Sequence, residues 1–144
     1  MSYTLDANVL LYASDQSSPY HERSRTLLAQ AAAGPEIVYL FWPTIMAYLR
    51  IATHPAVFRE PLAMTDAIGN IDALIGRPHV QTPGEQEPFW GRFVAVAADA
   101  RAAGNVVSDT QIVSLMLIHG VRTMWTHDRD FRLVRGIEVR DPFE

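Results

Sequence analysis

The sequence predicts an α/β domain with a mostly parallel central sheet, and two observations carry that prediction. Segments typical of strands alternate with segments typical of helices along the whole chain, as in parallel sheets joined by helical crossovers. The 144 residues are 49% hydrophobic and 19% charged, a composition typical of a folded protein with a sizeable core. The sequence contains no internal repeat and no low-complexity linker, so we expect a single domain over residues 1–144.

The first strand and the first two helices are expected before residue 35. The stretch "TLDANVLLYA" begins with a short apolar segment that favours a strand ending at Asp6, and the chain becomes helical soon after. The stretch "SSPYHERSRTLLAQAAAG" carries helix signals. Ser18 is a candidate N-cap, Pro19 suits the first helical position, and Gly34 suits the stop.

A strand and two helices are expected in the middle of the chain. Residues 36–41, "EIVYLF", are rich in aromatic and β-branched residues, which favours a strand. Pro43 suits the first turn of a helix that runs through "TIMAYLRIATH" and ends at Pro55. The stretch "PLAMTDAIGNIDALIG" predicts another helix, with Thr65 as its N-cap. The expected apolar face of this helix comprises Ile68, Ile71, Leu74 and Ile75.

The last part of the chain predicts three short strands and two helices. The strands are expected in "HVQTP", "VRTMWT" and "IEVR". Residues 85–104 favour a helix, and four of its residues are spaced for burial: Phe89, Phe93, Val96 and Ala97. The apolar stretch "SDTQIVSLMLIHG" predicts the other helix, closed by Gly120. Because crossovers are right-handed, the carboxyl ends of the strands should lie along one edge of the sheet.

The composition excludes several classes of function. The chain has no cysteine, which rules out disulfide frameworks, thiol catalysis and cysteine-ligated metal sites. The net charge of −4 argues against nucleic-acid binding driven by bulk charge. The longest mainly apolar run, about 13 residues (37–49), is too short for a membrane span. The first residues lack the basic region of a signal peptide, so we expect a soluble, cytoplasmic protein without membrane association.

Separate segments carry carboxylates to places that the predicted sheet would bring together. Asp6 ends the first strand, and Asp109 lies at the start of an apolar helix. Asp128 and Asp130 follow the strand "VRTMWT". Clustered carboxylates repel one another, and hard divalent cations such as Mg²⁺ or Mn²⁺, which take oxygen ligands, relieve that repulsion. Such a site can activate water for attack on a phosphodiester.

Each of these acids also has a simpler structural explanation. Asp6, followed by Asn8, suits a turn at a strand end, and "HDRD" suits a solvated turn. Asp109 suits a helix cap, although Ser108 and Gln111 have the spacing of a capping box that leaves Asp109 free. The shared edge of the sheet is what favours the metal site.

Four ordered pieces of the sequence together extend over nearly the whole chain: "LDANVLLYA", "FWPTIMAYLRIATHP", "GNVVSDTQIVSLMLIHG" and "TMWTHDRDF". In their order and spacing they resemble the PIN domain, and specifically the VapC-type toxins of type II toxin–antitoxin pairs. The resemblance implies a three-layer α/β/α sandwich with a central, mostly parallel sheet. It also implies a Mg²⁺- or Mn²⁺-dependent endoribonuclease that is usually dimeric and is neutralised by a small VapB-like antitoxin.

The same resemblance assigns roles to the aspartates. Asp6 corresponds to the first catalytic acid, Asp109 to the third and Asp128 to the fourth. Asp130 often accompanies the fourth acid, so it joins the expected metal ligands.

Two asparagines and one alanine complete the comparison with the family pattern. Asn8 and Asn105 are expected to hold the acids in place. Most relatives carry a glutamate on the helix after the second strand, in a pattern like "E-x-L-R", and here "AYLR" places Ala47 at that position. Either the aspartates suffice, or activity is weak, or another acid substitutes. The candidates for that substitution are Glu36, Glu60 and Asp66.

The resulting hypothesis is a metal-dependent ribonuclease that cuts structured RNA, such as tRNA or a ribosomal loop, where bases are single-stranded. Arg129 and Arg132 are expected to hold backbone phosphates at the rim of the site. A phosphatase of the haloacid dehalogenase type is disfavoured, because Asn8 replaces its second aspartate and the chain has no lysine. The main alternative is a PIN-like domain that binds RNA or a partner with little or no catalysis because of Ala47.

Overall fold

Five parallel strands form the central sheet, in the order β3-β2-β1-β4-β5. The computed structural model describes residues 1–144 apart from the side chain of Leu133. The strands are β1 (Ser2–Leu5), β2 (Ile37–Tyr39), β3 (Val80–Gln81), β4 (Thr123–Trp125) and β5 (Glu138–Arg140). In the central register, Tyr3 of β1 lies between Val38 of β2 and Thr123 of β4. The predicted parallel sheet is confirmed.

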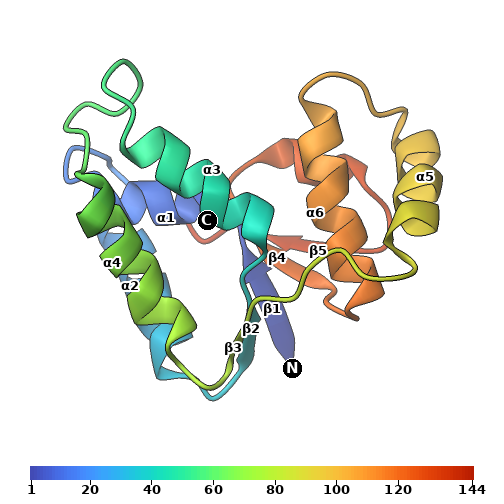
Figure 1. Cartoon of the computed structure of the whole chain (residues 1–144), viewed down its shortest axis with the longest axis horizontal. Helices are drawn as coiled ribbons and strands as arrows, with labels where there is room; N and C mark the ends of the chain where they lie inside the picture. The colour runs from blue at the N-terminus through green and yellow to red at the C-terminus, as the bar shows by residue number, and fades with distance from the viewer.

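Helices cover both faces of this sheet, which makes the three-layer sandwich that the resemblance implied. The helices are α1 (Ala7–Ser14), α2 (His21–Ala33), α3 (Trp42–Ala52), α4 (Met64–Ile75), α5 (Phe89–Ala100) and α6 (Val106–Ile118), with a short 3-10 helix, η1 (Arg129–Leu133). The helices α1 to α4 pack on one face, and α5 and α6 pack on the other. Figure 1 shows α2 and α4 to the left of the strands and α5 and α6 to the right. Among the described helices, none combines the length and hydrophobicity of a membrane span.

Alternation along the strands divides the interior into two cores. Tyr3 and Leu5 of β1 point into the core beneath α1 to α4, whereas Met124 of β4 points into the core beneath α5 and α6. Thr4, between Tyr3 and Leu5 in the sequence, is fully buried. Its hydroxyl donates to the Tyr39 carbonyl at 2.6 Å. A buried polar side chain is therefore satisfied within the sheet.

The start of α2 differs from the prediction. The helix begins at His21, so Ser18 is not its N-cap and Pro19 lies outside it. The Ser18 hydroxyl instead accepts a hydrogen bond from the Tyr20 backbone N–H at 3.1 Å, which makes a turn before the helix.

The starts of α4 and α6 were also predicted wrongly. The helix α4 begins at Met64, ahead of Thr65, and α6 begins at Val106, so Ser108 lies in its first turn. The predicted capping box is therefore absent at Ser108. None of α1 to α6, among the described residues, begins with a side-chain cap hydrogen bond. The preference for Ser and Thr at N-caps consequently did not mark these starts.

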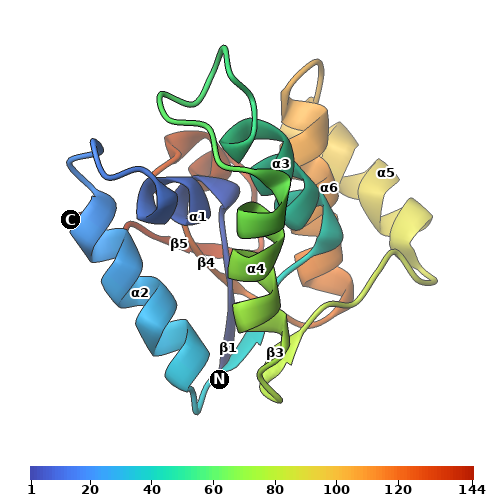
Figure 2. The same cartoon turned by 60° about the vertical axis from the view of Figure 1, so that its left-hand side comes forward.

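Two predicted apolar faces are only partly buried. On α4, Ile68 is 43% exposed, and Ala67 takes its place in the buried stripe with Ile71 and Leu74. On α5, Val96 is the residue that the structure buries, whereas Phe89, Phe93 and Ala97 are half-buried. Figure 2 shows α5 at the outside of the fold, with α6 between it and the sheet.

Candidate metal centre

Asp6 lies where the sheet topology opens a natural site. It follows β1 directly and is the residue before α1. The chain leaves β1 toward β2 on one side, while β4 pairs with β1 on the other side. In open α/β sheets, this reversal of strand order leaves a crevice at the carboxyl ends of the strands. The Asp6 backbone N–H donates to the Trp125 carbonyl of β4 at 3.0 Å, so the two strand ends are joined there.

Thr126, directly after β4, links two of the predicted acids. Its hydroxyl donates to Oδ2 of Asp6 at 2.7 Å and accepts from the backbone N–H of Asp128 at 2.9 Å. The side chain is almost fully buried. The sequence prediction missed this residue. Its only signal was a polar residue between an apolar strand and an acid two positions later.

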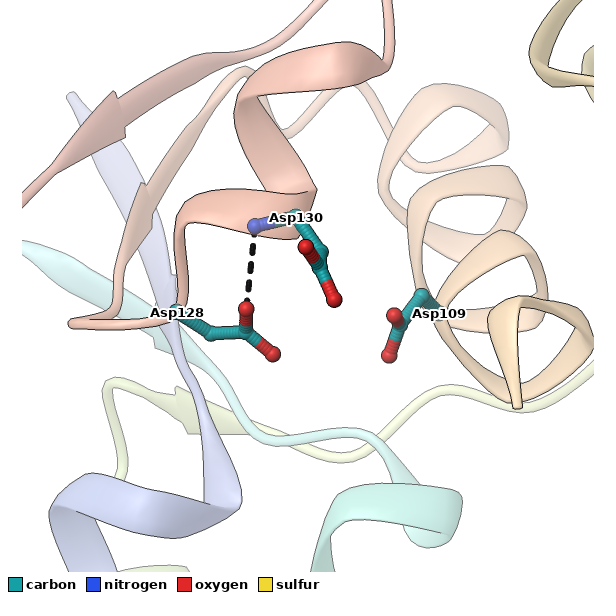
Figure 3. A group of neighbouring side chains, drawn as sticks. All are labelled: Asp109, Asp128 and Asp130. Carbon is teal, nitrogen blue, oxygen red and sulfur yellow. Dashed lines mark hydrogen bonds between the residues drawn. The ribbon is translucent and has the colours of Figure 1, made fainter.

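Three of the predicted acids form one cluster. Asp109, Asp128 and Asp130 each offer a carboxylate oxygen, and these oxygens lie within 4.8 Å of one another. Figure 3 shows Asp109 projecting from α6 toward the two aspartates of the β4–η1 segment. The Asp130 backbone N–H donates to Oδ1 of Asp128 at 2.9 Å, which leaves Oδ2 of Asp128 without that contact. The predicted meeting of separate segments at one edge is therefore present in the structure.

The carboxylates of this cluster lie close together in a partly buried part of the structure. Burial and, to a lesser extent, the neighbouring carboxylates of Asp128, Asp6 and Asp130 together raise the pKa of Asp109 to about 6. Burial also raises the pKa of Asp6, against the opposing hydrogen bond from Thr126. Crowded carboxylates of hard oxygen character are the donor set that Mg²⁺ and Mn²⁺ prefer, so these residues fit a divalent cation.

A cleft of about 550 Å³ opens beside these acids and contains the position of the missing glutamate. Its walls include Asp6, Asp109, Ala47 and Arg50. Among the described side chains that line it, only Asp6 and Asp109 are acidic. The proposed substitutes, Glu36, Glu60 and Asp66, are not among its lining residues. Ala47 therefore leaves open space on the α3 side of the cleft.

Of the remaining predicted residues, Asn8 contacts a carboxylate of the site: its backbone N–H donates to Asp6, which acts to lower the pKa of Asp6 against the effect of burial. Asn8 is half-buried in α1, and Asn105 is exposed just before α6. Arg129 and Arg132 are both exposed on η1, and Arg132 contacts Glu144 at 3.8 Å. Arg50 is a further cation at the cleft, which the sequence prediction did not assign to the site.

The chain is similar to known proteins over nearly its whole length. It is 46% identical over 143 residues to ribonuclease VapC48 of Mycobacterium tuberculosis, covering 99% of both chains. It is 30% identical over 140 residues to ribonuclease VapC43 of the same organism, covering 97% of this chain and 95% of the relative. No protein-family model matches the chain.

Solved structures share the fold at low sequence identity. VapBC2 from Rickettsia felis, bound to a DNA fragment from its promoter, has a TM-score of 0.70 at 14% identity, with 98% of each chain covered. Mycobacterium tuberculosis VapC20, described as a toxin that cleaves the sarcin–ricin loop, has a TM-score of 0.67 at 15% identity. That match covers 96% of this chain and 98% of VapC20.

Proposed function

This chain belongs to the VapC ribonuclease family, and on that premise we propose that it is a Mg²⁺- or Mn²⁺-dependent endoribonuclease, the toxin of a toxin–antitoxin pair. The observation that carries the proposal is the meeting of Asp109, Asp128 and Asp130 at the crevice between β1 and β4. Asp6 stands beside them and is joined to Asp128 through Thr126. A site of four carboxylates with an adjoining cleft suits a cation and the phosphodiester next to it.

The aspartates have separable tasks in this proposal. Asp109, Asp128 and Asp130 hold the cation, with Asp6 as a further ligand. A cation bound there makes a water molecule more acidic and offsets negative charge on the scissile phosphodiester. Thr126 keeps Asp6 and Asp128 in register through its two hydrogen bonds. Because the RNA 2′-hydroxyl is not needed as nucleophile, the products should carry 5′-phosphate and 3′-hydroxyl ends.

Arginines around the acids are the proposed contacts to RNA phosphates. Arg129 and Arg132 project from η1, next to Asp128 and Asp130. Arg50 lines the cleft from α3. Guanidinium groups bind phosphate oxygens well, and a local cluster of them can act in a chain of net charge −4. We propose structured RNA, such as tRNA or a ribosomal loop, as the substrate in the cytoplasm, cut where its bases are single-stranded.

Two protein partners follow from the family. We propose that a VapB-like antitoxin neutralises the enzyme, because structural neighbours such as the Rickettsia felis complex contain both proteins. A cleft of about 590 Å³ between α1, α2 and α4 is the proposed seat for an apolar antitoxin segment, since its walls include Leu10, Leu28 and Leu74. A second copy of the chain is the other proposed partner.

The decisive experiment uses the chain purified free of any antitoxin. Total cellular RNA is incubated with it in Mg²⁺, in Mn²⁺ and in EDTA, and the cleaved ends are mapped by sequencing. We expect discrete cuts that require the cation and disappear in the Asp6→Asn and Asp109→Asn variants. Cuts that persist in both variants would refute the assignment of the site. No cuts with either cation would instead favour a binding-only domain, with Ala47 as the reason.

A further inference from the structure

A partly buried histidine–aspartate contact joins the residue before Asp128 to the segment after β5. Nδ1 of His127 lies 2.7 Å from Oδ2 of Asp141, whose side chain is only 2% exposed. The same Asp141 carboxylate accepts the Phe143 backbone N–H at 2.9 Å. Burial opposes ionisation of Asp141, but these hydrogen bonds together lower its pKa. The carboxylate is therefore a stable acceptor for His127.

His127 occupies the position between two residues of the metal centre. Thr126 directs its hydroxyl to Asp6, and Asp128 directs its carboxylate to the cluster with Asp109. The His127 side chain instead bonds to Asp141, in the segment after β5. His127 lies at a bend of the chain between these two residues, so a side chain fixed on Asp141 restricts the rotation of the backbone that carries Asp128.

Further contacts hold the segment Asp141–Glu144 against the rest of the fold. The Phe143 ring stacks on Tyr20, with ring centres 4.3 Å apart and planes 17° from parallel. The His127 ring lies 4.9 Å from the Tyr20 ring and 5.3 Å from the Phe143 ring. Arg23 of α2 donates to the Phe143 carbonyl at 2.8 Å. The acceptor for His127 is thus anchored to an element outside the metal centre.

We propose that His127 and Asp141 are positioning residues that hold Asp128 and Asp130 in the geometry needed to bind the divalent cation. This inference rests on the proposed function. It assigns the segment after β5 a part in metal binding, although that segment contributes no ligand. Residues behind metal ligands commonly change metal affinity by about 10–100-fold when they are lost.

The test compares a pair of variants that differ in one hydrogen bond. His127→Ala removes the donor to Asp141, whereas His127→Asn keeps an N–H donor close to the position of Nδ1. We expect His127→Ala to weaken Mn²⁺ affinity about 10–100-fold, with a similar loss in kcat and little change in KM for RNA. His127→Asn should recover most of the Mn²⁺ affinity. Hydrogen exchange of the amides of residues 126–130 should become faster in the alanine variant only.

Asp15→Ala is the matched control. Like Asp141, Asp15 accepts a hydrogen bond from the backbone N–H two residues later, here that of Ser17 at 3.0 Å. This contact is exposed, and Asp15 is not next to any of the acids in the sequence. It should bind Mn²⁺ as the wild type does. Unchanged Mn²⁺ affinity in His127→Ala, with a wild type that cleaves RNA, would overturn the positioning role alone. A wild type that neither binds Mn²⁺ nor cleaves RNA would overturn the proposed function, and the inference with it.

Discussion

The Thr126 hydroxyl is the single group that joins the acid after β1 to the acid after β4. It donates to Asp6 and accepts from the Asp128 N–H, and it is almost fully buried. Thr126→Val keeps the shape but removes both hydrogen bonds, so the two carboxylates lose their common support. We expect a decrease in kcat of about 10–100-fold, the range typical of residues that orient metal ligands. Thr126→Ser retains the hydroxyl and should stay close to the wild-type rate in the same RNA cleavage assay, and equal rates for the valine and serine variants would contradict the role.

Asp109 makes the metal-free protein sensitive to pH. Its pKa is about 6 in the folded chain, against an ordinary value of 3.8. Between about pH 4 and about pH 6, the folded state binds more protons than the unfolded state. The free energy of unfolding therefore decreases as the pH rises from about 4 to about 6. Asp109→Asn removes that cost and should raise the Tm of the metal-free protein by about 3 °C at pH 8, with little effect at pH 4.

The control for this prediction is Asp66→Asn, because Asp66 lies in the first turn of α4 as Asp109 lies in the first turn of α6. An acid there is favoured by the helix dipole, so its loss should leave the Tm unchanged or slightly lower at pH 8. Scanning calorimetry in EDTA measures both variants. A Tm that falls for Asp109→Asn at pH 8 would mean that the acids do not repel one another in the folded chain.

The sequence alone predicted the acids of the site, but not the residues whose hydrogen bonds hold them in place. Asp109, Asp128 and Asp130 were predictable because each stands at the end of a recognisable element, and a sheet edge collects such positions. Thr126 and Asp141 also follow strands, but the sequence does not show which side chains they contact. Their roles arise from contacts to residues 120 and 14 positions away in the sequence, which only the folded chain defines.

The helix α3 presents Ala47 to the cleft that Asp6 and Asp109 also line. Ala47→Glu adds a carboxylate on the α3 side of the cleft, at the position of the glutamate in the family pattern "E-x-L-R". We expect Mn²⁺ affinity to increase on the order of tenfold, because the number of charged ligands tunes the affinity of such sites. Ala47→Gln, of nearly the same size but uncharged, should gain much less in the same calorimetric titration. A glutamate variant that binds Mn²⁺ no better than the wild type would show that Ala47 does not face the cation.

At the element scale, the order and kind of strands and helices were predictable, but several helix starts were not. The spacing of apolar residues identifies strands and helices, because the residues on the buried face recur with the period of the element. The start of α4 at Met64, ahead of Thr65, has no side-chain hydrogen bond to mark it. A preference for Ser or Thr at N-caps is a local rule, whereas most helical stability in proteins comes from the packing of an apolar face.

Among the described residues, large apolar side chains are exposed on four α-helices. They are Trp42 and Met46 on α3, Met64 and Ile68 on α4, Trp90 and Val94 on α5, and Val107 on α6. Exposed apolar groups of this size are typical of surfaces that bind another protein, and a second copy of the chain is the proposed occupant. Trp90 has the highest exposed fraction among them, 71%. Trp90→Glu should shift the mass measured by light scattering from dimer to monomer, whereas Arg92→Glu, also exposed on α5, should not.

A monomer in the wild type, or a dimer unchanged by Trp90→Glu, would exclude α5 from a self-association surface.

The fold brings carboxylates from separate elements together at one edge of the sheet, and we propose that they bind a divalent cation there. The most direct measurement is calorimetric titration of the metal-free chain with Mn²⁺ at pH 8, where Asp109 is ionised. We predict saturable binding in the wild type that is lost in Asp109→Asn and retained in Asp66→Asn. Equal binding by the wild type and Asp109→Asn, or none by either, would contradict the claim.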